Sequence, residues 1–170
     1  MIVGVATAWN DDKGLKDYVS LSRMLGEEYQ IALIGVSESV REILPNRVIG
    51  IPKTDSIDKL SFIYSLADVV TSLSYAESLG MTPIEGMACG TPAIVYDNTA
   101  QPELIDEKCG LVVPTGDIEA LKKAIEEIKI KEKKSYSKAC VERVRKYFNK
   151  EERYNDYINL YKELCGQKNW

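Results

Sequence analysis

Residues 68–96 read DVVTSLSYAESLGMTPIEGMACGTPAIVY, and this stretch decides the fold. Its opening, as far as about Leu73, is rich in β-branched side chains and predicts a buried strand. A loop and a helix near 82–89 follow, and a second β-branched run at 92–96 predicts another strand. A strand, a helix and a strand in this order indicate parallel neighbours joined by a crossover helix.

The same alternation extends over about the first 130 residues. Further strands are predicted at 2–7, 30–35, 47–50 and 110–113, with helices near 14–25, 38–44, 56–66, 101–106 and 118–129. This pattern is typical of the α/β class, with a Rossmann-like parallel sheet flanked by helices. We therefore expect one domain over 1–170, with its core at about 1–130 and C-terminal helices at about 131–166.

The last helix, 150–165, carries apolar and aromatic residues at helical spacing. Stripes of this kind usually form packing surfaces. We expect this stripe to cover the sheet or to dock on a partner domain.

The overall composition excludes several classes of protein. The chain is 45% hydrophobic and 28% charged, which is a globular balance, and its net charge of −4 argues against a nucleic-acid binder. No apolar run approaches the ~20 residues that span a bilayer, so we expect no membrane segment. The first residues already read as a strand, which suggests a truncated chain or one half of a larger enzyme.

Cysteine and histidine usage limits the chemistry further. The cysteines are not spaced as C-x-x-C and the chain has no histidine, so we expect no zinc site. Scattered cysteines in a domain with an ample core indicate free thiols and a cytoplasmic location. Catalysis by Ser-His-Asp or Cys-His groups is excluded for this chain.

Ligands of open parallel sheets collect at the carboxyl ends of the strands, which directs attention to the loop at 73–82. Beyond it, Thr82 suits the N-cap of a helix, Pro83 suits the first position, and Glu85 falls at the third. Glu85 therefore has two interpretations. It reaches back to the backbone of Thr82 as a cap, or it faces a ligand.

The ligand interpretation begins from the uncovered N–H groups of residues 78–82, which make the helix start a site for an anion. Gly80 lets the backbone approach that anion closely. Glu77, at the loop start, and Glu85 can both face the same cavity, where carboxylates accept hydrogen bonds from vicinal hydroxyls. An anionic linker between two polyol ends describes a nucleotide-sugar, although Glu77 is equally compatible with a solvated loop.

The stretch from Glu77 to Glu85, followed by MACGTPAI at 87–94, resembles the E-x7-E region of group 1 glycosyltransferases. These are family 4 retaining enzymes with the GT-B fold. The similarity continues in DNTAQPELI at 97–105, in CGLVV at 109–113 and in YSLAD at 64–68. The resemblance implies a donor-binding C-terminal half that transfers a hexose-type sugar from a nucleotide-diphosphate donor. It also implies that the protein binds no metal and no cofactor, and that this half is inactive without an N-terminal acceptor domain.

The resemblance also implies residue roles. Glu77 matches the glutamate that meets donor-sugar hydroxyls, and Glu85 matches the one that binds the nucleotide ribose. Lys13, with Gly14 after it, matches the lysine that meets the donor phosphates. The backbone amides of Ser78, Leu79, Gly80 and Met81 match those that approach the sugar and the diphosphate. Peripheral association with a membrane is compatible with this family, whose acceptors include lipid-linked ones.

One departure from the family pattern concerns the phosphate clamp. Many members place an arginine five residues before the lysine, where this chain has Ala8. Either Lys13 and the helix start suffice, or Lys53 contributes from a neighbouring loop. The loop at 50–54 lies where the family holds the base.

Three alternatives remain at this point. Asp11 and Asp12 invite comparison with a phospho-receiver domain, but the runs that should supply its acceptor aspartate end in Gly35 and Gly50. A non-catalytic nucleotide-sugar-binding module is favoured by Ala8. A GT-B relative with epimerase or phosphorylase chemistry is disfavoured by the motif at 77–85.

Overall fold

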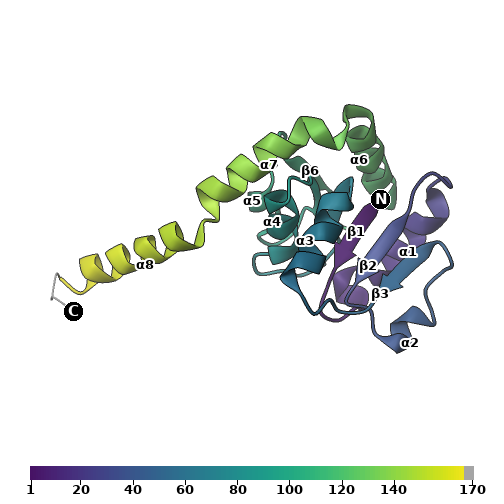
Figure 1. Cartoon of the computed structure of the whole chain (residues 1–170), viewed down its shortest axis with the longest axis horizontal. Helices are drawn as coiled ribbons and strands as arrows, with labels where there is room; N and C mark the ends of the chain where they lie inside the picture. Colours follow the sequence, from purple (N-terminus) through teal and green to yellow (C-terminus); the bar gives the residue numbers. More distant parts are fainter. Residues whose placement is uncertain (167–170) are drawn as a thin grey trace.

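The structure is a computed structural model, and it describes residues 1–166. All six predicted strands are present as one parallel sheet in the order β3-β2-β1-β4-β5-β6. The strands are β1 (Ile2–Val5), β2 (Ile31–Ile34), β3 (Val48–Ile51), β4 (Val69–Ser72), β5 (Ala93–Tyr96) and β6 (Gly110–Val113). The α/β prediction is therefore confirmed (Figure 1).

Helices cover both faces of this sheet, so the central strands β1, β2, β4 and β5 are buried on both sides. The first helices are α1 (Leu15–Met24), α2 (Glu38–Arg41), α3 (Ile57–Leu66) and α4 (Met81–Ala88). They are followed by α5 (Gln101–Leu104), α6 (Ile118–Lys131), α7 (Lys133–Tyr147) and α8 (Lys150–Leu164). A short 3₁₀ helix, η1 (Asp11–Lys13), precedes α1.

Two glycines show which helix lies on which face. A Cβ on Gly4 of β1 would lie 2.5 Å from the Tyr18 hydroxyl of α1, so α1 lies directly against the strand. A Cβ on Gly86 of α4 would lie 2.6 Å from Val70 of β4. Val70 pairs in register with Val3, the neighbour of Gly4, and successive strand residues point to opposite faces. Helix α1 with α6, and α4 with α3 and α7, therefore form the two outer layers.

Helix α8 departs from the sequence prediction, because no residue on it is buried and it extends away from the sheet (Figure 1). The apolar stripe was expected to cover the sheet, yet Ile158 is 48% and Leu164 is 73% exposed. Helix α7 covers α4 and buries Tyr136 and Cys140, so it is α7 and not α8 that packs on this side of the domain. Covering the sheet is therefore the wrong interpretation of this stripe.

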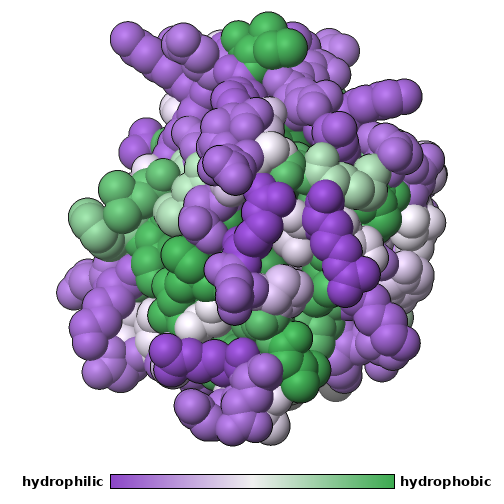
Figure 2. Space-filling model, turned by 90° about the vertical axis from the view of Figure 1, so that its right-hand side faces the viewer, coloured by the Kyte–Doolittle hydropathy of each residue, from purple (hydrophilic) through white to green (hydrophobic). Residues whose placement is uncertain are grey.

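The face beside the edge strand β3 mixes apolar and hydrophilic groups (Figure 2). Ile43 and Ile49 are 70% and 46% exposed there. Within residues 1–166, no helix combines the length and the apolar character needed to cross a membrane.

Candidate functional site

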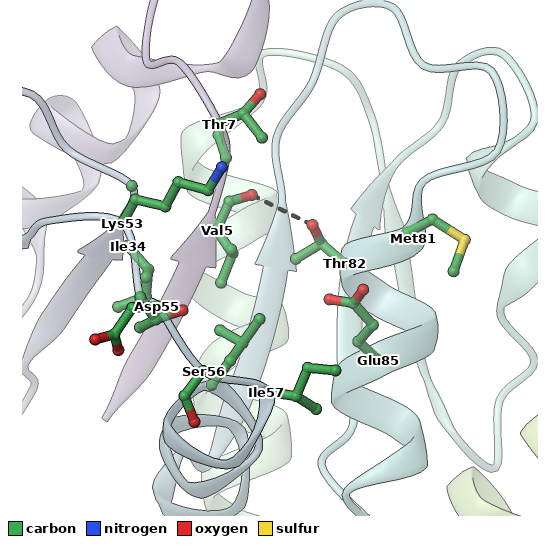
Figure 3. A pocket seen from close by; sticks show the side chains of 14 residues that line it. Val5, Thr7, Ile34, Lys53, Asp55, Ser56, Ile57, Met81, Thr82 and Glu85 are labelled. Atoms are coloured by element: carbon green, nitrogen blue, oxygen red, sulfur yellow. Dashed lines mark hydrogen bonds between the residues drawn. The ribbon is translucent and has the colours of Figure 1, made fainter.

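The carboxyl ends of the strands surround a cavity of about 430 Å³ (Figure 3). It lies where the strand order reverses, since β1 pairs with β2 on one side and with β4 on the other. Parallel sheets bind ligands at such a reversal because the loops diverge there. The lining comes from the ends of β1 and β2, the loop after β3, the start of α3 and the first turns of α4, and it includes Thr7, Gly35, Lys53, Met81, Thr82 and Glu85.

Helix α4 begins earlier than the sequence predicts. Gly80 is its N-cap, with a φ of 82°, and Met81 is its first residue. Thr82 was expected to cap the helix, but its hydroxyl donates to the carbonyl oxygen of Val5 at 3.3 Å. Gly80 adopts a left-handed conformation, which glycine tolerates, so the helix begins two residues before Pro83. Because the capping residue is a glycine, no side-chain cap forms.

The capping-box interpretation of Glu85 is consequently wrong. Glu85 lies a full turn beyond Met81, and its side chain points into the cavity from α4 (Figure 3). Its Oε2 accepts a hydrogen bond of 2.9 Å from the Tyr64 hydroxyl of α3. Burial, and then the nearby Glu85 carboxylate, raise the pKa of Tyr64 far above its usual value, so this hydroxyl remains a donor.

Lys13 and Glu77, which the family resemblance assigns to the donor phosphates and the donor sugar, form an ion pair with each other. Lys13 Nζ donates to Glu77 Oε2 at 2.7 Å, and their side chains are 33% and 22% exposed. Gly14 places Lys13 beside Glu77, because its φ of 72° turns the chain so that η1 lies against the end of β4. A Cβ at Gly14 would lie 2.3 Å from the carbonyl oxygen of Leu73. The Tyr75 amide also donates to the Asp12 carbonyl at 2.8 Å, which fixes the two loops together.

This ion pair lies beside the cavity and not in its lining. Neither Lys13 nor Glu77 belongs to the cavity wall. A Cβ on Gly80 would lie 3.3 Å from Glu77 Cγ, and the next residue, Met81, does line the cavity. The loop of Ser78 and Leu79 therefore connects the ion pair to the cavity, at the positive end of α4.

Two side-chain amides also hold the loop before α4 in place. Asn98 Nδ2 and Gln101 Nε2 both donate to the Ser74 carbonyl oxygen at 3.0 Å. Gln101 is fully buried. Sequence reasoning gave neither residue a role, nor Tyr64. Nothing in the local sequence distinguishes these three side chains, because their partners are set only by tertiary packing.

Lys53 lies in the loop after β3 and lines the cavity opposite Glu85. Its side chain extends toward Thr7, the residue before Ala8 (Figure 3). Within the described chain, 1–166, its ammonium makes no ion pair with a carboxylate. No three acidic or cysteine side chains in that part converge as metal ligands do.

Known proteins resemble this chain in sequence and in structure. A D-inositol 3-phosphate glycosyltransferase of Mycobacteroides abscessus is 37% identical over 86 residues, which are 50% of this chain and 19% of that protein. Sucrose-phosphate synthase from Thermosynechococcus elongatus superimposes with a TM-score of 0.83 at 30% identity, over 97% of this chain and 45% of that chain. HepE from Anabaena in complex with UDP-glucose gives a TM-score of 0.69 at 20% identity, over 84% of this chain and 42% of that chain.

The chain thus spans less than half of each of these three proteins. The likeness to HepE, at its low identity, shows the fold alone. The Rossmann-like sheet expected for one half of a GT-B fold is confirmed. The family profile described as "Glycosyl transferases group 1" matches residues 9–159, and this covers most of the sequence. The chain therefore belongs to the group 1 glycosyl transferases.

Proposed function

We propose that this chain is the donor-binding, C-terminal half of a retaining glycosyltransferase that transfers a hexose-type sugar from a nucleotide-diphosphate donor. The observation that carries the proposal is the cavity at the strand reversal, with Glu85 on one wall and Lys53 opposite. The Lys13–Glu77 pair lies beside it, one short loop away. Acidic and basic groups thus occur both in the cavity wall and beside it, as a donor with hydroxyls at both ends and phosphates between would require.

In this proposal the donor lies along the loop from Glu77 to the start of α4. Glu85 accepts hydrogen bonds from the ribose hydroxyls, and Glu77 accepts them from the sugar. The diphosphate lies between them, near the amides of 78–81 and the first turn of α4, whose N–H groups have no helical partners. HepE, which shares the fold, has been solved with UDP-glucose, and this supports a nucleotide-sugar as the ligand class.

Lys13 is assigned to the donor phosphates. An ammonium group has three donors, so Lys13 can keep its bond of 2.7 Å to Glu77 and still bind a phosphate oxygen. As the bond to the sugar breaks, negative charge grows on the leaving diphosphate. Lys13 and the N-terminus of α4 stabilise that charge electrostatically, so the proposal includes no protein-bound metal or other cofactor.

Lys53 is assigned to the second cationic position. The arginine that many family members carry five residues before the lysine is Ala8 here. Lys53 reaches toward the neighbouring Thr7 from another loop, so its charge approaches the same region of the cavity (Figure 3). Its compact ammonium lacks the fork geometry of arginine, which favours weaker donor binding.

The acceptor and the rest of the catalytic cleft are assigned to an N-terminal domain outside this chain. The exposed apolar stripe of α8 supports this part of the proposal, because it has no partner among residues 1–166. The chain alone should bind the donor weakly and turn nothing over. The four free cysteines favour a cytoplasmic location.

A non-catalytic nucleotide-sugar-binding module is the second candidate, and Ala8 is the observation that favours it. Rejoining this domain to an acceptor domain and measuring sugar transfer distinguishes the two. Transfer that Lys13→Ala abolishes supports the enzyme, whereas tight donor binding without transfer supports the module.

Titration calorimetry with UDP, GDP and their sugars tests the shared claim of donor binding. We expect one of the two bases to give saturable binding, with inorganic phosphate alone giving much less. Absence of binding to every nucleotide at millimolar concentration would contradict the proposal.

A further inference from the structure

The phenol of Tyr64 connects the hydrophobic core to the cavity. Its side chain is 1% exposed, and its hydroxyl donates to Glu85 Oε2 at 2.9 Å. Tyr64 belongs to α3 and Glu85 to α4, so the bond joins two separate walls of the site. A phenylalanine would fill the same space without burying a hydroxyl, which is costly unless the hydroxyl is bonded.

Tyr64 is itself held firmly from behind. The hydroxyl of Thr91, which is fully buried, donates to the Tyr64 carbonyl oxygen at 2.6 Å. Thr91 lies between α4 and β5, so this bond ties the last turn of α3 to the sheet. This bond anchors the backbone that carries the phenol, and burial confines the ring itself.

The bond leaves Glu85 open on its ligand side. Within the described residues 1–166, the Tyr64 hydroxyl is the one group that donates to this carboxylate. A carboxylate has two oxygens with about four acceptor sites, so Oε1 and the remaining lone pairs stay free for a ligand in the cavity. A carboxylate fixed before the ligand arrives loses less side-chain freedom on binding.

We propose that Tyr64 is a positioning residue, which orients Glu85 for the ribose diol of the bound nucleotide. The inference rests on the proposed function, because it assigns the diol to Glu85. It adds a residue outside the cavity lining that contributes to binding through another side chain.

The test is Tyr64→Phe in the full chain, titrated with UDP and GDP and with their 2′,3′-dideoxy analogues. We expect affinity for the ribonucleotide to fall about 3- to 10-fold, the size of one lost hydrogen bond. Affinity for the dideoxy analogue should not change, because it lacks the diol. Tyr18→Phe is the matched control: it also removes a fully buried hydroxyl, which donates to the Thr71 carbonyl at 2.8 Å outside the cavity.

A second comparison uses Glu85→Gln as the background. Adding Tyr64→Phe to this variant should change ribonucleotide affinity by less than about twofold, because the two residues act as one unit. Melting temperatures of both phenylalanine variants should fall by similar amounts, which separates stability from binding.

The outcomes distinguish the inference from the proposed function. If the wild type binds a ribonucleotide and Tyr64→Phe loses affinity equally for the ribonucleotide and its dideoxy analogue, the inference is overturned but the proposed function is not. Unchanged ribonucleotide affinity in Tyr64→Phe overturns it as well. Failure of the wild type to bind any nucleotide overturns the proposed function, and the inference with it.

Discussion

Replacing Gly14 with alanine tests whether the backbone places Lys13 beside Glu77. Gly14 has a φ of 72°, and a left-handed conformation costs a residue with a Cβ about 1–2 kcal/mol. The added Cβ would also lie 2.3 Å from the Leu73 carbonyl oxygen, which is backbone and cannot move as a side-chain tip does. Overpacking of this kind costs about 1–3 kcal/mol. The free energy of unfolding should therefore fall by roughly 2–5 kcal/mol, the sum of these two ranges.

Gly90→Ala provides the matched control. Gly90 has nearly the same φ, 75°, but its Cβ would meet Ser137 Cβ at 3.4 Å, an ordinary contact. It should lose only the conformational cost, about 1–2 kcal/mol. The smaller entropy of the unfolded chain is common to both variants and cancels in the difference.

Urea unfolding followed by circular dichroism measures both changes, with ΔG obtained by linear extrapolation. The reasoning is refuted if Gly14→Ala is no less stable than Gly90→Ala. Equal losses would mean that η1 moves away from β4 at little cost, and that the Lys13–Glu77 contact is loosely held.

Four further predictions concern charge and ionisation. Glu85→Gln should lower ribonucleotide affinity roughly 10- to 150-fold in calorimetry, which is the cost of losing a hydrogen bond to a charged group. The melting temperature should change little, because Glu85 does not cap α4. Unchanged affinity would remove the ribose role of Glu85. Ala8→Arg should raise donor affinity about 3- to 30-fold by restoring a charged donor, and a titration showing no gain would place the phosphates elsewhere. Burial raises the pKa of Cys109 to about 11 and that of Cys140 to about 12, so at pH 8 both should react with a thiol reagent far more slowly than the exposed Cys165. In the unfolded chain these thiols ionise near pH 9, whereas in the folded protein they ionise only at higher pH. The free energy of unfolding should therefore fall as pH rises above about 9. A urea midpoint that stays the same from pH 8 to 10 would contradict these pKa shifts.

The sheet was predictable from sequence because each strand is a short β-branched run between turn residues. The run at 68–73, for example, contains β4, and the run at 92–96 contains β5. Helix ends were less predictable. Thr82 and Pro83 carry strong start signals, yet Gly80 overrides them because it alone there accepts a positive φ at no cost.

The site was predictable as a set of residue types and not as a set of contacts. Sequence spacing placed Glu77 at the start of a loop and Glu85 in the first turn of the helix after it. In the structure Glu77 lies in that loop, beside the cavity, and Glu85 lies a full turn beyond the start of α4, in the cavity wall. Spacing could not show that Lys13 meets Glu77, because the two lie 64 residues apart and only the fold joins them. It also could not show that Glu85 meets Tyr64, or that α8 extends from the domain, since both depend on which surfaces are already occupied.

The position of the cavity has a consequence for how the molecule folds. Lys53 comes from the half of the sheet formed by β1–β3, whereas Glu85 comes from the half formed by β4–β6. These halves meet through the β1–β4 pairing, a long-range contact that forms slowly. A half-assembled chain lacks one wall of the cavity, so a nucleotide that binds there, as proposed, would select the completed sheet and stabilise it by mass action. The ligand would thus report on the last step of assembly, and a refolding chain would gain affinity only when its two halves have closed.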